Sequence, residues 1–169
     1  MILYIIRHAI AEPAGRSENE DDSRRPLTPK GRRKMHQIAL GLKELEVQID
    51  LLLSSPYLRA SQTARILGKT LGIRSERVAL SDNLMPGAYA DRLVHEINLI
   101  YAGCENIALI GHEPSLSSLI SMLISGDPTL FVTLKKGGVC KLSLEALRYG
   151  RCATLEWLLA PSQLVEIGA

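Results

Sequence analysis

The sequence predicts an α/β fold, a three-layer α/β/α sandwich with a mostly parallel sheet and an antiparallel C-terminal edge. Short apolar runs of strand length alternate with stretches of helical periodicity, which is typical of a parallel sheet covered by helices. The last two apolar stretches alternate like the paired strands of a hairpin. With 169 residues, 46% of them hydrophobic, the chain can build an aliphatic core, and we expect a single domain over residues 1–169.

The first expected strand covers residues 2–7, which are apolar at successive positions, as in a strand that is buried on both faces. Residues 12–25 have almost nothing to bury and predict a long surface loop. The acidic run within 18–22 is expected to be solvated rather than to bind a metal. Thr28 suits the N-cap of a helix over 29–45, which has proline at its first position.

Strands and helices are expected to alternate along the rest of the chain. Alanines and leucines recur at helical spacing in the second helix, and Gly72 is suited to end it. The C-terminal strand pair is expected to lie at one edge of the sheet. The expected strands of this part cover residues 51–54, 78–80, 107–110, 139–144 and 154–159, and the expected helices cover residues 60–71, 91–101 and 116–123.

Composition and charge argue against several classes of protein. A net charge of +2 is far from the dense basic surface of nucleic-acid binders, so we expect no nucleic-acid partner. Three cysteines without C-x-x-C spacing argue against a disulfide framework or a zinc site and favour a reducing cytoplasm. The N-terminal apolar run lacks a basic start and is interrupted by Arg7, so we expect neither a signal peptide nor a membrane span.

Spacing excludes two classes of phosphate-handling enzyme. A cysteine-dependent phosphatase has arginine six residues after its cysteine, but that distance here leads to Ile110, Ala146 and Leu158. A P-loop enzyme requires G-x4-G-K-[ST], and no such run exists. The spacing of the four histidines indicates no metal site, and we expect no cofactor.

Four polar residues follow the ends of expected parallel strands. Arg7 and His8 close the first strand, Arg59 lies a few residues after the second, and His112 lies two residues after the strand at 107–110. In open parallel sheets, ligands bind in the crevice beyond the carboxyl ends of the strands. We therefore expect these four side chains to meet in one crevice.

Basic residues at two expected helix starts indicate an anionic ligand. Arg59 lies in the first turn of its helix, and residues 30–34 place four cations in the first two turns of another. A cation there is disfavoured by roughly 0.3 to 1 kcal/mol, whereas a bound phosphate would reverse the sign and match the fork of an arginine. Taken singly, such arginines are usually solvated and a lone histidine is usually structural; the joint pattern favours a phosphate site.

Four blocks of the sequence resemble those of one known family. They are "IIRHA", "RPLTPKG", "SSPYLRASQTA" and "IGHEP", and they occur in the family's order along nearly the whole chain. The sequence thereby resembles the histidine phosphatase (phosphoglycerate mutase-like) superfamily. Its short length, without the large insertions that build substrate lids in the mutases and acid phosphatases, most resembles the SixA-type phosphohistidine phosphatases.

The resemblance implies a role for each matching residue. In this family a histidine becomes transiently phosphorylated, and arginines and a second histidine bind the phosphoryl group. The implied set comprises His8 as nucleophile, Arg7, Arg59 and His112 as phosphoryl ligands, and Arg25 and Ser55 as further substrate contacts.

The chemistry of imidazole agrees with these roles. A histidine attacks only when neutral, and flanking arginines lower its pKa from about 6.5, which keeps the ring of His8 unprotonated near neutral pH. If a backbone carbonyl holds Nδ1–H, then Nε2 keeps its lone pair for phosphorus. Arg7, Arg59 and a protonated His112 would stabilise the charge that spreads over the phosphoryl oxygens, without a metal.

The sequence departs from the family pattern at two places. Ala9 stands where glycine is usual and could tighten the turn beside His8. In the segment "LSDNLMPGAY", Asn83 occupies the position of the family's proton donor, and Asp82 lies next to it. Because asparagine cannot donate that proton, either Asp82 takes the role or the leaving group needs little protonation by the protein. Phosphohistidine, with its labile P–N bond, has such a leaving group.

We therefore expect a metal-independent hydrolase that acts on phosphohistidine through a covalent phosphohistidine enzyme intermediate. The alternatives are a small-molecule phosphomonoesterase of the same superfamily and an inactive phosphate- or phosphoprotein-binding module. The expected partner is a phosphorylated protein, such as a histidine-containing phosphotransfer domain, or a small phosphate compound. The basic helix start at 30–34 could dock an acidic partner. The sequence does not determine the oligomeric state.

Overall fold

A mixed β-sheet organises the computed structural model, which describes residues 1–15 and 21–169. Its six strands lie in the order β3-β2-β4-β1-β5-β6. The first four strands in this order are parallel, whereas β5 is antiparallel to β1 and β6 is antiparallel to β5. The strands are β1 (Ile2–Arg7), β2 (Leu51–Ser54), β3 (Val78–Leu80), β4 (Asn106–Gly111), β5 (Val139–Leu144) and β6 (Ala153–Leu159). The expected fold class and its antiparallel C-terminal edge are confirmed.

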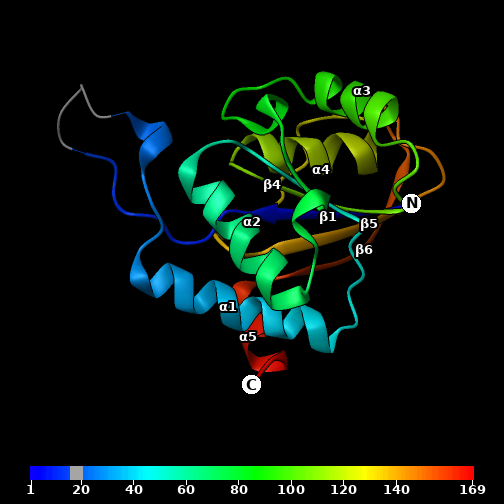
Figure 1. Cartoon of the computed structure of the whole chain (residues 1–169). Coiled ribbons are helices and arrows are strands. Elements are labelled where there is room, and N and C mark those ends of the chain that lie inside the picture. The colour runs from blue at the N-terminus through cyan, green and yellow to red at the C-terminus, as the bar shows by residue number, and fades with distance from the viewer. Residues whose placement is uncertain (16–20) are drawn as a thin grey trace.

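Helices cover both faces of this sheet. Figure 1 shows α3 and α4 on one side and α1 and α5 on the other, and α2 packs beside α1. None of the helices in the described residues is long and apolar enough to cross a bilayer. The helices are α1 (Pro29–Glu44), α2 (Leu58–Leu71), α3 (Ala90–Ile100), α4 (Ser115–Ser125) and α5 (Pro161–Ile167), with 3-10 turns η1 (Asp22–Arg24), η2 (Ser75–Arg77) and η3 (Asp82–Leu84).

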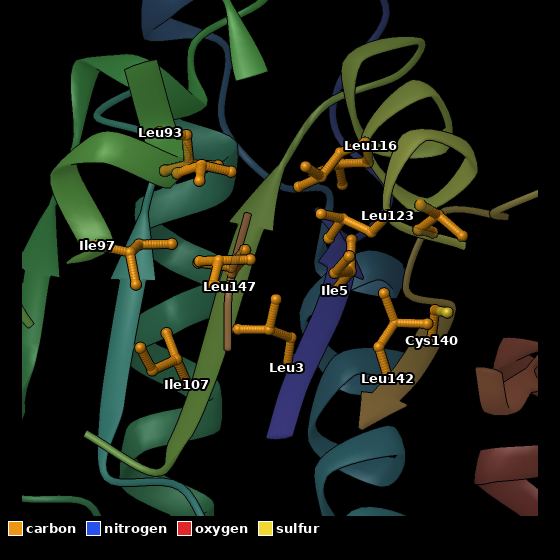
Figure 2. Close-up of a cluster of buried hydrophobic side chains, with 14 of the residues drawn as sticks. Leu3, Ile5, Leu93, Ile97, Ile107, Leu116, Leu123, Cys140, Leu142 and Leu147 are labelled. Atoms are coloured by element: carbon orange, nitrogen blue, oxygen red, sulfur yellow. The ribbon is translucent and has the colours of Figure 1, made fainter. Parts of the chain in front are cut away.

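Strand β1 shows how the alternation of side chains builds two cores. Leu3 and Ile5 point to one face, where Figure 2 shows them among leucine and isoleucine side chains of α3 and α4. Tyr4 and Ile6 point to the opposite face and pack against α1, α2 and α5. Because both faces of β1 are covered, the strand is apolar at successive positions until the polar residues at its carboxyl end.

The ends of the first two helices follow the predicted local chemistry. The Thr28 Oγ1 accepts a hydrogen bond from the Gly31 amide at 2.8 Å, and Pro29 occupies the first turn of α1, as the N-cap pattern predicts. Gly72 ends α2 with φ at +70°, a conformation that glycine adopts without steric cost.

Two segments differ from the sequence-based expectation. The loop expected over 12–25 contains the 3-10 turn η1, and the Ala11–Leu27 bridge closes it; residues 16–20, with the acidic Glu18 and Glu20, lie outside the described residues. Helix α5 was not expected, because seven residues carry little periodicity. It packs on α1, where the Leu164 carbonyl lies directly against Gly41.

Candidate active site

Strand register brings the ends of β1, β2 and β4 to one edge of the sheet. Arg7 of β1 lies beside Gly111 of β4, and Ser54 of β2 lies beside Ile110. The pairing continues one residue past the strands, since the His8 amide donates to the Gly111 carbonyl at 3.1 Å. The four candidate residues therefore come from segments whose polar ends share this edge, as the expected crevice requires.

The two imidazoles lie side by side within this edge, tilted against each other. The ring centroids of His8 and His112 are 5.1 Å apart, with 52° between the ring planes. Both residues are buried, with 6% and 3% of their surface exposed. The two histidines are 104 residues apart in the sequence, so only the sheet order brings them together.

The surroundings of His8 keep its ring neutral and define its tautomer. His8 Nδ1 lies 2.7 Å from the Ala9 carbonyl oxygen, which only accepts, so Nδ1 carries the proton and Nε2 keeps its lone pair. Burial lowers the pKa of His8 to about 4; the charges of Arg59 and Arg7 act in the same direction, and the bond to Ala9 opposes them. The His8 ring is therefore uncharged at neutral pH, as a histidine nucleophile would have to be.

His112 is held by Ser55 and is also uncharged. Its Nε2 lies 2.9 Å from the Ser55 Oγ, a hydroxyl that can donate or accept. Burial lowers the pKa of His112 to about 3, and the nearby His8 and Arg59 add to this effect. Without a bound anion His112 is therefore neutral. The expectation of a protonated His112 concerns the state with a phosphoryl group bound, and it stays a prediction.

Two arginines lie close enough to His8 for their charges to lower its pKa. Arg59 stacks on Tyr57, with its Cζ 5.0 Å from the ring centroid, and Tyr57 packs edge-on against His112 at 5.2 Å. Arg7 donates from Nη1 to the Leu134 carbonyl at 3.0 Å. These contacts hold part of each guanidinium group in place.

Four buried polar side-chain atoms have no hydrogen-bond partner within residues 1–15 and 21–169. Three of them are nitrogens, the Arg7 Nε, the Arg59 Nε and the His112 Nδ1, and the fourth is an acceptor, the Glu113 Oε1. A buried unpaired polar group costs about 1–3 kcal/mol, so a cluster of them indicates a ligand. Two arginine donors and an imidazole nitrogen suit an oxyanion such as a phosphoryl group.

A comparison with known families agrees with this arrangement. The family model described as histidine phosphatase superfamily (branch 1) matches residues 3–101, more than half of the chain. The chain belongs to the histidine phosphatase superfamily. The matched region contains Arg7, His8 and Arg59, whereas His112 lies beyond it.

Individual members of the superfamily extend the similarity to almost the whole chain. Phosphohistidine phosphatase SixA of Escherichia coli K12 is 30% identical over 171 residues, which cover 97% of this chain and 96% of SixA. A protein of Picosynechococcus sp. PCC 7002 is 33% identical over 150 residues, 88% of each chain. The solved structure of the protein histidine phosphatase SixA complexed with tungstate superimposes with a TM-score of 0.80 at 29% identity, covering 97% of this chain and 99% of that one.

Thr63 links two segments of the candidate site, and the sequence analysis missed it. Its buried Oγ1 accepts from the Ala9 amide at 3.1 Å and donates to the Arg59 carbonyl at 2.7 Å. Thr63 thus ties the turn after His8 to the first turn of α2. Its position four residues after Arg59, on the same helix face, was a usable signal. Ala9 is itself buried in the core, so it fits where glycine is usual.

Arg25 lies near the site but is engaged by protein groups. Its Nε donates to the Asp22 Oδ1 at 2.9 Å, and its Nη2 forms an ion pair with the same oxygen at 2.8 Å. Its Nη1 donates to the Glu12 carbonyl at 2.9 Å. The expectation that Asp22 is merely solvated is wrong, because this carboxylate pairs with both Arg25 and Arg59. Although partial burial raises it, these arginines hold the pKa of Asp22 below its usual value.

The candidate proton donor is separated from this network. Asp82 is exposed at the start of η3, and within the described part of the chain it makes no side-chain hydrogen bond or ion pair with the arginines and histidines above. The neighbouring Asn83 donates from Nδ2 to the Glu96 Oε2 at 2.8 Å. Neither residue has the contacts of a positioned general acid. Among the described residues, no group of three His, Cys, Asp or Glu side chains could hold a metal ion.

Proposed function

We propose that this protein is a phosphohistidine phosphatase that works through a covalent phosphohistidine intermediate on His8. One observation carries the proposal: a buried neutral imidazole with a free Nε2 lone pair lies beside the unpaired donors of Arg7 and Arg59. A nucleophile next to preformed oxyanion contacts is the arrangement that phosphoryl transfer needs. The similarity to SixA, a phosphohistidine phosphatase by name, supports the choice of substrate.

The reaction proceeds in two displacements. The lone pair of His8 Nε2 forms a bond to phosphorus while the P–N bond of the substrate breaks, and the electron pair leaves with the substrate imidazole, which takes a proton from water. Water then attacks phosphorus, the electron pair of the breaking P–N bond returns to His8 Nε2, and inorganic phosphate is released. The proton that the attacking water loses neutralises the hydroxide formed in the first step. During the first step the ring of His8 becomes cationic, and the Ala9 carbonyl stabilises that charge through Nδ1–H.

Arg7, Arg59 and His112 are proposed to bind the transferring phosphoryl group. Arg7 and Arg59 would each donate from the buried Nε that has no partner in the described structure. A phosphoryl dianion beside His112 would favour the charged imidazole, so that ring would gain its proton when substrate binds. Ser55 supports both states, because its hydroxyl can donate to a neutral Nε2 or accept from a protonated one.

The region of Asp82 and Asn83 favours a nitrogen leaving group. A sugar phosphate leaves as an alkoxide and needs a positioned acid, whereas Asn83 is bonded to Glu96 and Asp82 is exposed. Phosphohistidine needs no such donor. A small-molecule phosphomonoesterase, with Asp82 as general acid, is the alternative that this arrangement disfavours.

The partner and the compartment follow as parts of the same proposal. A phosphorylated protein, such as a histidine-containing phosphotransfer domain, is the proposed substrate, with small phosphoramidates as the alternative. The free thiols Cys104, Cys140 and Cys152 favour a reducing compartment, hence the cytoplasm. We regard residues 1–169 as one domain.

Covalent trapping tests this function. Wild-type protein incubated with ³²P-labelled phosphohistidine and quenched in alkali should carry an acid-labile label, and the variant His8→Ala should carry none. His36→Ala is the matched control, because His36 is an exposed histidine bonded to Thr70, and it should be labelled like the wild type. A binding module would leave both wild type and His8→Ala unlabelled. Hydrolysis of sugar phosphates as fast as phosphohistidine would overturn the choice of substrate.

A further inference from the structure

Asp22 holds the guanidinium of Arg59 by one edge. The Arg59 Nη1 donates to the Asp22 carbonyl oxygen at 2.7 Å, and the Arg59 Nη2 donates to the Asp22 Oδ2 at 2.8 Å. The side chain of Arg59 is 4% exposed and that of Asp22 is 48% exposed, so an accessible carboxylate pairs with a buried cation. Two contacts to one residue fix both the place and the tilt of the guanidinium plane.

These contacts leave the other edge of Arg59 for the substrate. A guanidinium can bind a forked acceptor either through Nη1 and Nη2 or through Nε and Nη2. Asp22 takes the first edge, and the buried Nε of the second edge has no partner within residues 1–15 and 21–169. Stacking on Tyr57 holds the remaining face.

Arg25 contacts the other carboxylate oxygen of Asp22, the Oδ1. Its Nε donates to the Asp22 Oδ1 and its Nη2 forms an ion pair with the same oxygen, while Oδ2 is bonded to Arg59. Each oxygen of Asp22 therefore serves one arginine. Asp21 stabilises the turn from the other side, because its Oδ1 accepts from the Ser23 amide at 2.9 Å.

We propose that Asp22 is a positioning residue, which holds Arg59 by its outer edge so that the Nε edge faces the reacting phosphoryl group, and that Arg25 steadies Asp22 rather than binding substrate. The inference rests on the proposed function, since it assigns Arg59 to the phosphoryl group. The loop between β1 and α1 thus supplies a carboxylate beside the arginines of the candidate anion site.

Two variants of Asp22 separate position from charge. Asp22→Glu keeps the charge and displaces the carboxylate by one methylene, and Asp22→Asn keeps the shape and removes the charge. Both should lower kcat for an aryl phosphate by about tenfold and leave KM within about threefold, because a misplaced Arg59 loses contact mainly in the transition state. Asp21→Asn is the matched control: it removes the same charge one residue away, retains the turn cap, and should stay within about twofold of wild type.

A double-mutant cycle tests whether Asp22 works through Arg59. Lysine at position 59 keeps a charge but has no fork to align, so Asp22→Glu should cost less than about twofold in an Arg59→Lys background. Arg25→Gln should lower kcat, whereas a substrate contact would raise KM. An equal loss from Asp22→Glu in both backgrounds, or unchanged kcat in the Asp22 variants, would overturn the inference.

Binding of orthovanadate, which mimics the transition state of phosphoryl transfer, separates failure of this inference from failure of the proposed function. Calorimetric titration with orthovanadate needs no turnover, and Asp22→Glu should weaken its binding in the wild-type background but not in the Arg59→Lys background. A wild-type protein that binds orthovanadate with this coupling but hydrolyses nothing would refute the function alone. Circular dichroism of each variant checks that it is folded.

Discussion

His8 shows how much one side chain depends on its immediate contacts. A single backbone carbonyl selects its tautomer, and burial with two neighbouring arginines selects its charge. In the unfolded chain a histidine titrates near 6.5, whereas here the pKa of His8 is about 4. Because the unfolded chain takes up a proton first, this histidine weakens the fold as the pH falls from about 6.5 towards 4.

The lowered pKa predicts that the His8 ring stays unprotonated in mild acid. The His8 ring should stay neutral from pH 8 down to about 5 and should become protonated as the pH falls through about 4. Two-dimensional NMR of the imidazole nitrogens, followed from pH 8 to 3.5 and assigned with the His8→Gln variant, measures this directly. A midpoint of 6 or higher would contradict the described environment of His8.

At the scale of elements, helix α1 packs against two other segments of the chain through close backbone contacts at its glycines. A Cβ added to Gly31 would collide with the Ile10 carbonyl oxygen, and one added to Gly41 would collide with the Leu164 carbonyl oxygen. Gly31 thus lets the start of α1 lie against the segment that follows His8. By contrast, a Cβ added to Gly68 in α2 would make only ordinary van der Waals contacts. The nearest atom would be the Leu52 Cδ1, at 3.5 Å.

This difference predicts opposite outcomes for the same substitution. Gly31→Ala should destabilise the protein by about 1–3 kcal/mol and lower activity, because the start of α1 must move away from the His8 segment. Gly68→Ala should be neutral or stabilising by up to about 1 kcal/mol, since alanine is the better helix former. Urea unfolding of both variants, with kcat/KM measured alongside, tests the pair. An unchanged free energy of unfolding for Gly31→Ala would show that Gly31 and the Ile10 carbonyl are not in close contact.

At the scale of the whole molecule, the candidate site joins segments that are remote in sequence. It draws residues from the ends of β1 and β4, from the segment after β2 and from the loop before β5, where the Leu134 carbonyl holds Arg7. An anion bound there contacts several of these segments at once. Binding is therefore linked to the stability of the entire fold.

Inorganic phosphate should consequently raise the melting temperature. At about 100 times its dissociation constant, a ligand that binds only the native state adds about 2.7 kcal/mol, which corresponds to roughly 5–10 °C for a chain of this size. Differential scanning calorimetry with increasing phosphate should show this rise for the wild type and lose most of it for Arg7→Ala. Equal shifts in both proteins would place the phosphate elsewhere.

Sequence patterns predicted the strands and helices α1 to α4, and they placed the four central residues at one edge of the sheet, because both follow from local rules. Buried strands are apolar at successive positions, and their carboxyl ends share one edge, which is enough to bring His8 and His112 together. The role of Asp22 could not be seen in this way, because an acidic loop residue looks solvated until the fold brings Arg59 to it.

Two further results depended on neighbours distant in the sequence. Helix α5 is too short for a periodic signal, and its contact with Gly41 becomes visible only in three dimensions. The charge of His112 depends on burial and on surrounding cations, which the residue type does not reveal. Local sequence is informative about elements, whereas protonation and ion pairing are properties of the assembled fold.

The two close contacts of α1 fix the number of residues between them. Gly31 and Gly41 lie about 15 Å apart along the axis, and each has room for a carbonyl oxygen from a different part of the chain. One inserted residue between them would turn one end of the helix by about 100° relative to the other, so both carbonyls could not be accommodated together. The number of residues in α1 is therefore constrained as tightly as their kinds, and drift in length is confined to the surface loops.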